Sequence, residues 1–167
     1  MLTNYDIPRI FKFYNTPLTF IGMKNQMPKV VKDGSYIINL ESAPLCGSHW
    51  LALAVRGTQA FYCDSFGAPA PLEVIAFVKR RRGCHLSYNN VICQDLASEN
   101  CGYYASACLI YLHRHQNNSL IGTARQYLKL YHDDSRENDD ILRSIYHKFA
   151  PVSPPLITRL NNEHIKY

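Results

Sequence analysis

Residues 49–64 constrain the fold more than any other segment, because two apolar stretches flank a short polar one. The stretches HWLALAV and QAFYCD are rich in aromatic and aliphatic residues, which is typical of strands. Residues 56–59 (RGTQ) between them predict a hairpin loop. A loop of even length places Leu51 opposite Asp64, and this register decides which side chains share a face of the sheet.

The rest of the chain predicts helices and further strands around this hairpin. SYIINL and HLSYNNVI have the composition of strands, and PLEVIAFVKRRR opens with proline and has helical apolar spacing at Leu72, Ile75, Ala76 and Val78. Residues 3–14 predict a short helix with Thr3 and Asp6 in capping positions, and residues 101–115 predict a longer one with an apolar face. Two more helices are expected near 119–131 and 137–149, and the proline-rich tail begins irregularly. The expected class is α+β, with the strands in the middle of the chain.

Length and cysteine content limit the class of protein. A chain of 167 residues fits one domain (residues 1–167) with a sizeable core. The start MLTNYDIPRI lacks the pattern of a signal peptide, and no apolar run approaches the roughly 18 residues of a membrane span. Six cysteines without a C-x-x-C pair predict reduced thiols. We therefore expect a protein that is made inside a cell, is not secreted and does not associate with membranes.

Cys101 lies where a polar loop becomes an apolar helix, in the stretch SENCGYYASACLIYL. At a helix N-terminus, unpaired N–H groups and the helix dipole both favour the thiolate, which is the nucleophilic form of cysteine. Gly102 would let a substrate backbone approach closely. Most cysteines in such proteins are inert core residues, so Cys101 also needs a base.

Among the seven histidines, His49 is the best placed to be that base. His113 and His115 lie on the same predicted helix as the thiol, roughly 18–21 Å further along its axis. His49 lies two residues before Leu51 and hence on the face of Asp64, at a diagonal separation of roughly 7–8 Å. An aspartate there can hold the imidazole tautomer and favour its charged form, whereas a register slip of one residue would move it to the other face.

Gln94 lies seven residues before Cys101, at the end of a predicted strand. Its amide can donate to an oxyanion beside the N–H of Cys101. An ordinary loop glutamine is the alternative interpretation.

These residues resemble a known family. The chain contains, in this order, the histidine of GSHW, the acid of CDSFG, and a glutamine seven positions before the cysteine of CG. The order of the residue types is therefore His, acid, Gln, Cys. The order resembles that of the adenovirus-type cysteine proteases (adenain) and of the wider clan that includes the SUMO proteases. Two features resemble adenain: the seven-residue step from Gln94 to Cys101 and the phenylalanine-glycine pair after the acid. The acid itself is typically glutamate in adenain. Here it is Asp64, and the SUMO proteases also have aspartate at this position. The resemblance, which includes a weak likeness of FIGMKNQMP to the start of adenain, covers roughly residues 3–115.

The resemblance implies a central mixed sheet with the nucleophile helix packed against it. It implies hydrolysis of peptide bonds after glycine, often in Gly-Gly or Gly-x-Gly sites, with Cys101, His49, Asp64 and Gln94 in the catalytic roles. Trp50, beside the histidine, could roof a narrow channel that only glycine passes, although a plain core tryptophan is an equal alternative.

The resemblance also implies a biological setting. We expect an enzyme of a double-stranded DNA virus or virus-like element that cleaves capsid or core precursor proteins during virion maturation. It would act in the host nucleus or viral factory and inside the virion, as a monomer and without a required cofactor.

Regulation is a further expectation from the resemblance. The adenovirus enzyme is activated by DNA and by a peptide disulfide-linked to a cysteine upstream of the oxyanion glutamine. Here Cys84 lies ten residues before Gln94, directly after a basic run formed by Lys79, Arg80, Arg81 and Arg82. With a net charge of +5, the run could contact double-stranded DNA without sequence preference. The alternatives are a free loop thiol and a solvated helix end.

Two other functions stay open. The first is an isopeptidase that removes SUMO or ubiquitin-like modifiers with the same chemistry. The second is a non-catalytic nucleic-acid or zinc-binding module, for which Cys84, His85, Cys93 and Cys101 would be the ligands. Their spacing fits no familiar zinc pattern.

Overall fold

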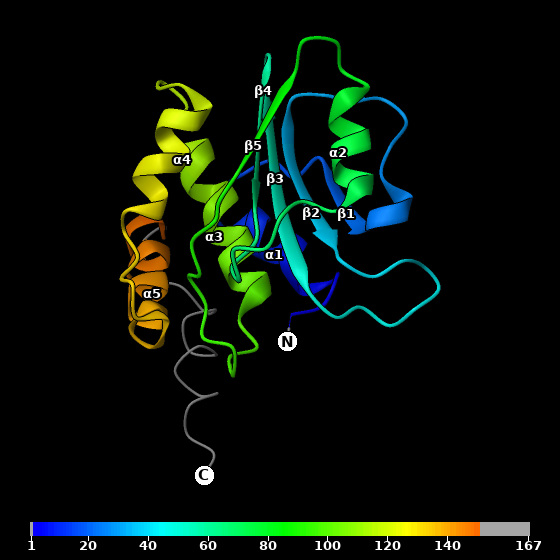
Figure 1. The fold of residues 1–167 in the computed structure, drawn as a ribbon. Coiled ribbons are helices and arrows are strands. Elements are labelled where there is room, and N and C mark those ends of the chain that lie inside the picture. The colour runs from blue at the N-terminus through cyan, green and yellow to red at the C-terminus, as the bar shows by residue number, and fades with distance from the viewer. Residues whose placement is uncertain (1, 151–167) are drawn as a thin grey trace.

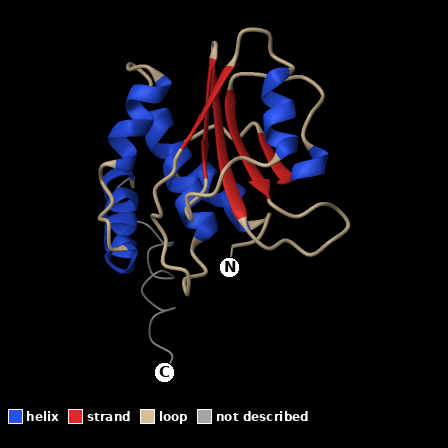
Figure 2. Cartoon of the chain, viewed as in Figure 1, coloured by secondary structure: helices blue, strands red, loops and turns tan. Residues whose placement is uncertain are grey.

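The computed structural model describes residues 2–150, which form a five-stranded mixed sheet between two layers of helices (Figures 1 and 2). The strands lie in chain order and are β1 (Phe20–Met23), β2 (Gly34–Asn39), β3 (Trp50–Arg56), β4 (Gln59–Cys63) and β5 (His85–Tyr88). The pairs β1–β2 and β4–β5 are parallel, whereas β2–β3 and β3–β4 are antiparallel. The predicted α+β class with a central mixed sheet is confirmed.

Helices cover both faces of the sheet. The elements are α1 (Asp6–Phe13), α2 (Leu72–Lys79), α3 (Cys101–Arg114), α4 (Leu120–Leu128) and α5 (Asn138–Phe149), with short 3₁₀ turns η1 (Lys24–Gln26) and η2 (Ser135–Glu137). Helix α2 packs on one face, and the other four helices pack on the opposite face (Figure 1). Because side chains alternate along a strand, Ala52 and Ala54 of β3 enter the larger core and Leu51 and Leu53 enter the smaller one.

The hairpin has the predicted register. Ala52 pairs with Cys63 and Arg56 with Gln59, so the turn consists of Gly57 and Thr58 alone. Gly57 has a φ of +58°, in the left-handed region that tight two-residue turns require. Continued by one residue, the register places Leu51 opposite Asp64, as predicted.

The N-terminal helix begins later than predicted, at Asp6. Thr3 and Asp6 bond to each other at this end of the helix, since the N–H of Thr3 donates to Asp6 Oδ2 (3.1 Å) and the N–H of Asp6 donates to Thr3 Oγ1 (3.3 Å), but the N-cap position falls on Tyr5, whose side chain does not cap the helix. Pro8 lies in the first turn, where no backbone donor is needed.

The structure corrects two details of the helices. Leu72, expected on the apolar face of α2, is 80% exposed, and the buried face is formed by Val74, Phe77 and Val78. Helix α3 is not one-sided, because every residue from Cys101 to Leu112 is buried between the sheet and the other helices.

The other differences are an additional strand and the tail. Strand β1 was not predicted, since its four residues contain a glycine and are only partly buried. The two helices expected after α3 are present as α4 and α5. The proline-rich tail, 151–167, lies outside the described residues. No helix within residues 2–150 is long and apolar enough to cross a bilayer.

Candidate active site

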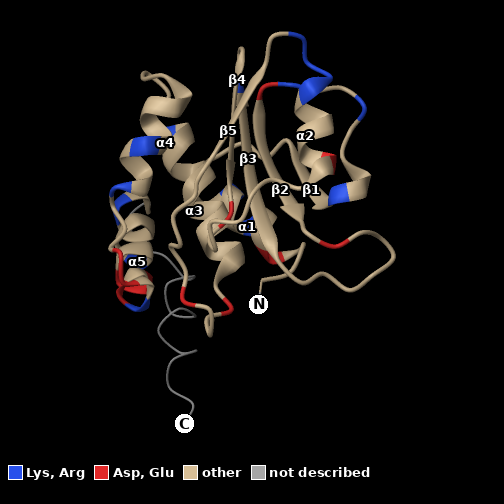
Figure 3. Cartoon of the chain, in the orientation of Figure 1, with Lys and Arg blue, Asp and Glu red and all other residues tan. Residues whose placement is uncertain are grey.

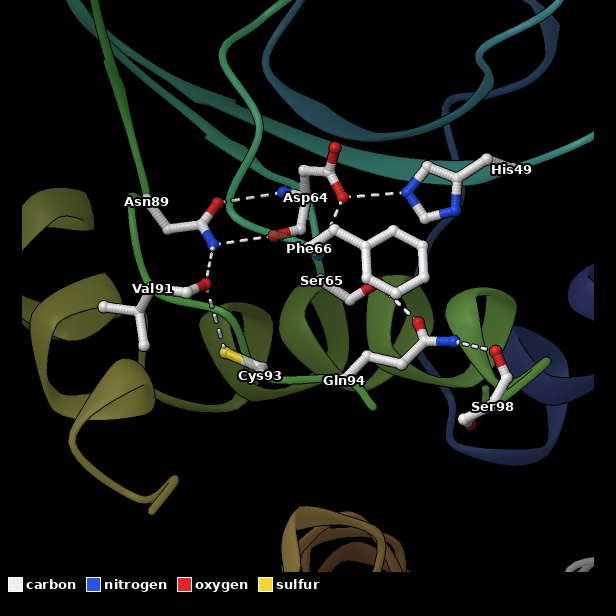
Figure 4. A network of polar contacts seen from close by, with 9 residues as sticks. All are labelled: His49, Asp64, Ser65, Phe66, Asn89, Val91, Cys93, Gln94 and Ser98. Atoms are coloured by element: carbon white, nitrogen blue, oxygen red, sulfur yellow. Dashed lines mark hydrogen bonds and ion pairs between the residues drawn. The ribbon is translucent and has the colours of Figure 1, made fainter. Parts of the chain in front are cut away.

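His49 and Asp64 meet at the end of the sheet where β3 begins and β4 ends. His49 directly precedes β3, and its carbonyl accepts a hydrogen bond from the N–H of Leu40 (2.9 Å), just beyond β2. The imidazole Nε2 lies 2.8 Å from Asp64 Oδ1 (Figure 4). Both residues are more than 90% buried, so solvent screens the pair little. The hairpin register thus brings together the two side chains that the sequence predicted as neighbours.

Asp64 is held by two residues that the sequence did not single out for this role, one at its backbone and one at its carboxylate. Asn89, just after β5, accepts from the N–H of Asp64 (2.9 Å) and donates to its carbonyl (2.7 Å). The N–H of Phe66 donates to Asp64 Oδ1 (2.9 Å), and the Phe66 ring stacks on the imidazole with centroids 4.8 Å apart (Figure 4). The imidazole is therefore held at its edge by the carboxylate and at its face by an aromatic ring.

Cys101 is the first residue of α3, as predicted, and it is 3% exposed. Its thiol lies near the imidazole of His49 and the backbone N–H groups of Trp50 and Gly102, and all three act to lower the pKa of the thiol. Because Nε2 of the imidazole is bonded to Asp64, Nδ1 is the nitrogen left to face the thiol. The three side chains form a continuous chain of contacts from carboxylate to sulfur.

The pKa shifts in this chain favour a charged pair. Burial acts to lower the pKa of His49, but the hydrogen bonds to Asp64 and Cys101, together with the charges on both, raise it to about 9. Burial acts to raise the pKa of the Cys101 thiol, but the bonds from His49 and from the N–H groups of Trp50 and Gly102 bring it below the ordinary value. At neutral pH the arrangement thus favours a thiolate beside an imidazolium.

Gln94 is fully buried beside this chain of residues. Its Oε1 accepts from Ser65 Oγ (2.7 Å), and its Nε2 donates to the carbonyl of Ser98 (2.6 Å; Figure 4). The backbone N–H groups of Cys93 and Gln94 both donate to the carbonyl of Ser65, the residue after Asp64. The amide has two hydrogens, so one remains for an oxyanion after the bond to Ser98.

Trp50 and Gly102 contact each other, which corrects the expectation for Gly102. A Cβ on Gly102 would lie 3.2 Å from Trp50 Cδ1 and 3.0 Å from Leu2 Cβ. The indole Nε1 of Trp50 donates to the carbonyl of Leu2 (2.8 Å). A side chain at position 102 would thus crowd Leu2 and Trp50, and the Cα of Gly102 is buried against the N-terminal segment, where a substrate backbone does not have access to it.

A cavity of about 460 Å³ adjoins the site on the other side of Trp50. It is lined by the N-terminal segment 2–4, by β1 with Gln26, and by Asn39, Gly47 and Trp50. Trp50 therefore lies between this cavity and the beginning of α3. An extended peptide could lie in the cavity, which is lined by apolar and polar side chains in equal number.

The predicted basic run is not part of this site. The Arg81 guanidinium pairs with Asp33, and Asp33 also accepts from the N–H of Gly57 in the hairpin turn. That turn follows β3, whose seven residues span roughly 23 Å from the His49 end. Lys79, Arg80 and Arg82, which flank Arg81, are exposed, and Figure 3 shows the run at the end of the sheet opposite to the N-terminus.

The residues of the hypothetical zinc site are also separated. Cys84 and His85 lie at the beginning of β5, where His85 pairs with Gln59 near the hairpin turn, far from Cys101. Within residues 2–150, no group of three or more His, Cys, Asp or Glu could hold a metal ion. All six cysteines are free thiols.

Comparisons with known proteins agree with the fold. No protein-family model matches the chain, and no curated protein sequence matches it. Among solved structures, the crystal structure of the ASFV pS273R protease is similar, with a TM-score of 0.54 and 18% identity over 92% of this chain and 68% of that chain. The selenomethionine form of the same protease aligns with a TM-score of 0.45 and 19% identity over 71% of this chain and 45% of that chain. The first of these structures shows that the chain has the fold of a viral cysteine protease, and the comparisons do not single out adenain.

Proposed function

We propose that the chain is a cysteine endopeptidase. The observation that carries the proposal is the buried sequence of contacts from Asp64 through His49 to Cys101, with the thiol on the first residue of a helix. A core cysteine with no catalytic role would have no need of a buried imidazole and carboxylate, which are costly to bury.

The proposed mechanism begins with Cys101 as a thiolate and His49 as the protonated partner. His49 holds the proton of the thiol, and the Cys101 thiolate attacks the carbonyl carbon of the substrate. Negative charge develops on the carbonyl oxygen, where backbone N–H groups at the beginning of α3 and the second amide hydrogen of Gln94 can stabilise it. His49 then protonates the leaving amine, and water, deprotonated by His49, releases the acyl group from Cys101.

The proposed substrate has glycine at the cleaved bond. Trp50 packs over the beginning of α3 and leaves little width beside the nucleophile, which supports a residue without a side chain. The adjoining cavity is lined in part by Leu2, Ile21 and Met23, so we expect an apolar side chain upstream of that glycine.

The proposed setting is that of a double-stranded DNA virus or virus-like element. The substrates would be capsid or core precursor proteins, cleaved in the nucleus or viral factory and inside the virion by a monomeric enzyme without a required cofactor. Double-stranded DNA at the basic run and a peptide linked to Cys84 are proposed activators. The net charge of +5 and the partial exposure of Cys84 support these two proposals.

An isopeptidase acting on ubiquitin-like modifiers is the second candidate, and the use of Asp64 as the acid favours it. The two activities differ in what must be recognised beyond the glycine. A protease of capsid precursors reads a short peptide, whereas an isopeptidase needs the folded modifier.

Electrophilic probes separate the two candidates. A short peptide ending in Gly-Gly and a vinyl sulfone should label Cys101, whereas SUMO and ubiquitin vinyl sulfones should label it no faster. Intact-mass spectrometry with peptide mapping gives the rates, and Cys101→Ala is the control. Much faster labelling by either folded modifier would replace the endopeptidase with the isopeptidase, and labelling mainly at another cysteine would refute both.

A further inference from the structure

Asn39, the last residue of β2, is buried but uses only one end of its side-chain amide. The residue is 1% exposed. Its Oδ1 accepts from the N–H of Glu41 (3.0 Å) and from the N–H of Ser48 (3.3 Å), and so holds both ends of the loop between β2 and β3. These two bonds fix which end of the amide is the oxygen, because only the oxygen can accept. No acceptor within residues 2–150 bonds to Nδ2.

The unpaired Nδ2 lies at the wall of the cavity beside Trp50. Asn39 lines this cavity, and it lies directly opposite Trp50 in the pairing of β2 with β3. Gly47, which also lines the cavity, lies next to the amide, since a Cβ at this position would be 2.6 Å from Nδ2. The absence of a side chain at Gly47 therefore leaves Nδ2 uncovered.

The surroundings of Nδ2 favour a neutral acceptor. None of the residues that line the cavity carries a charge. A carboxylate would lose hydration there without gaining a cation, whereas a peptide carbonyl needs only one donor. Water can pair with Nδ2 in the free protein, and a peptide carbonyl can take the place of that water.

Asn39 is also fixed in position relative to the candidate base. The N–H of Leu40, the next residue, donates to the carbonyl of His49 (2.9 Å). Trp50 follows His49 and separates the cavity from Cys101. A peptide whose glycine carbonyl lies at Cys101 would therefore pass Trp50 and reach Asn39 with the residues that precede its glycines.

We propose that Asn39 is a specificity-determining residue, whose Nδ2 donates to a backbone carbonyl of the substrate, upstream of the glycines at the cleaved bond. The inference rests on the proposed function and deepens it. Because every residue type has the same backbone carbonyl, Asn39 selects an extended peptide conformation and not a particular side chain. The Oδ1 of the same amide keeps the loop between β2 and β3 in place.

The main test is Asn39→Asp, which keeps an oxygen for the N–H groups of Glu41 and Ser48 and replaces the donor with a second oxygen. The substrates are acetyl-Leu-Ala-Gly-Gly-aminomethylcoumarin and the shorter acetyl-Gly-Gly-aminomethylcoumarin. KM for the long peptide should rise about tenfold with kcat little changed, because a hydrogen bond is lost and a carboxylate oxygen faces the carbonyl. The kcat/KM for the short peptide, which does not reach Asn39, should stay the same.

Asn25→Asp is the matched control for the loop. Asn25 also holds this loop, through the bond from the N–H of Ala43 to its Oδ1 (3.0 Å), but it is exposed and does not line the cavity. The substitution makes the same change from amide to carboxylate and keeps that bond. It should leave KM for both peptides unchanged.

Gly47→Ala tests the same donor without adding a charge. Gly47 does not have a positive φ, so its backbone accepts alanine. The new Cβ would displace or cover Nδ2 and should raise KM for the long peptide alone. This variant replaces Asn39→Asp in the test if the carboxylate prevents folding.

Thioamide peptides identify the acceptor. Sulfur is a weaker acceptor than oxygen, so replacing the carbonyl oxygen of the leucine or of the alanine in the long peptide weakens one bond at a time. One of the two thioamides should raise KM for the wild type and cause no comparable further loss in Asn39→Asp, as expected for two changes that act on one interaction.

Three outcomes would overturn the inference: a wild-type KM for the long peptide in Asn39→Asp, an equal loss with both peptides, or an equal loss in Asn25→Asp. Binding tests it without catalysis, because Cys101→Ala should bind the fluorescein-labelled long peptide in anisotropy and adding Asn39→Asp should weaken that binding about tenfold. Failure of the proposed function would look different, since the wild type would then cleave neither peptide and its Cys101 would be alkylated no faster than the exposed Cys46.

Discussion

Replacing Asp64 with asparagine tests the charge at the site with little change of shape. The asparagine oxygen can still accept from His49 Nε2 and from the N–H of Phe66, and the bonds of Asn89 reach only the backbone of residue 64. The substitution therefore removes the negative charge and keeps the hydrogen-bonded arrangement. Any loss of reactivity of the Cys101 thiol then measures the electrostatic part of the interaction between Asp64 and His49.

The expected size follows from Coulomb's law. With charge centres about 4 Å apart and an effective dielectric constant of about 20, the interaction between carboxylate and imidazolium is about 4 kcal/mol. This corresponds to about 3 pKa units, so the pKa of His49 should fall from about 9 to roughly 6. At pH 7.5 only about 3% of the imidazole would then be protonated, and the thiolate–imidazolium pair should become about 30-fold rarer.

Alkylation of Cys101 by iodoacetamide, followed against pH by mass spectrometry, measures this loss. In the wild type the pair exists from the lowered pKa of the thiol up to about pH 9, where His49 loses its proton, so peptide cleavage should decline above that pH because the amine can no longer be protonated. In Asp64→Asn the alkylation profile should move to higher pH, with the exposed Cys46 as internal control. An unchanged profile would refute the assigned role of Asp64.

Further substitutions test the nucleophile, the oxyanion donor and the basic run separately. Cys101→Ala should abolish cleavage while circular dichroism and the melting temperature stay close to the wild type, and Cys46→Ala should cleave at the wild-type rate; any cleavage by the first variant would contradict the assignment. Gln94→Ala should lower kcat about 10²–10³-fold with KM nearly constant, whereas Ser65→Ala, which removes only the bond to Gln94 Oε1, should cost less; equal losses would point to a structural role. Alanine at residues 80–82 should weaken binding of double-stranded DNA in fluorescence anisotropy at low salt without changing peptide cleavage; no binding at low salt by the wild type would rule out the basic run as a DNA contact.

The parts of the site that the sequence predicted are those set by local periodicity. The hairpin register follows from a short loop and strand alternation, so the sequence alone places His49 and Asp64 on one face of the sheet. The polar-to-apolar change at Cys101 marks the beginning of a helix, and this boundary was also correct.

The parts that the sequence did not predict depend on contacts between distant segments. Leu2 packs on Gly102 and Asp139 holds Asn100, and no local pattern links residues about 100 or 40 positions apart. The buried face of α2 was misassigned for a related reason. A short helix whose residues are mostly apolar fits two faces, and only its position on the sheet decides between Leu72 and Val74.

The central claim is that Cys101 hydrolyses a peptide bond with the help of His49 and Asp64. The most direct measurement is mass spectrometry of a peptide library containing Gly-Gly and Gly-x-Gly sequences, incubated with the wild-type chain and with Cys101→Ala. We predict new C-termini at glycine in the wild-type digest alone. The same cuts made by Cys101→Ala would contradict the claim. So would the absence of any cut by a folded, unmodified wild-type chain when a separate sample shows that its Cys101 reacts selectively with iodoacetamide.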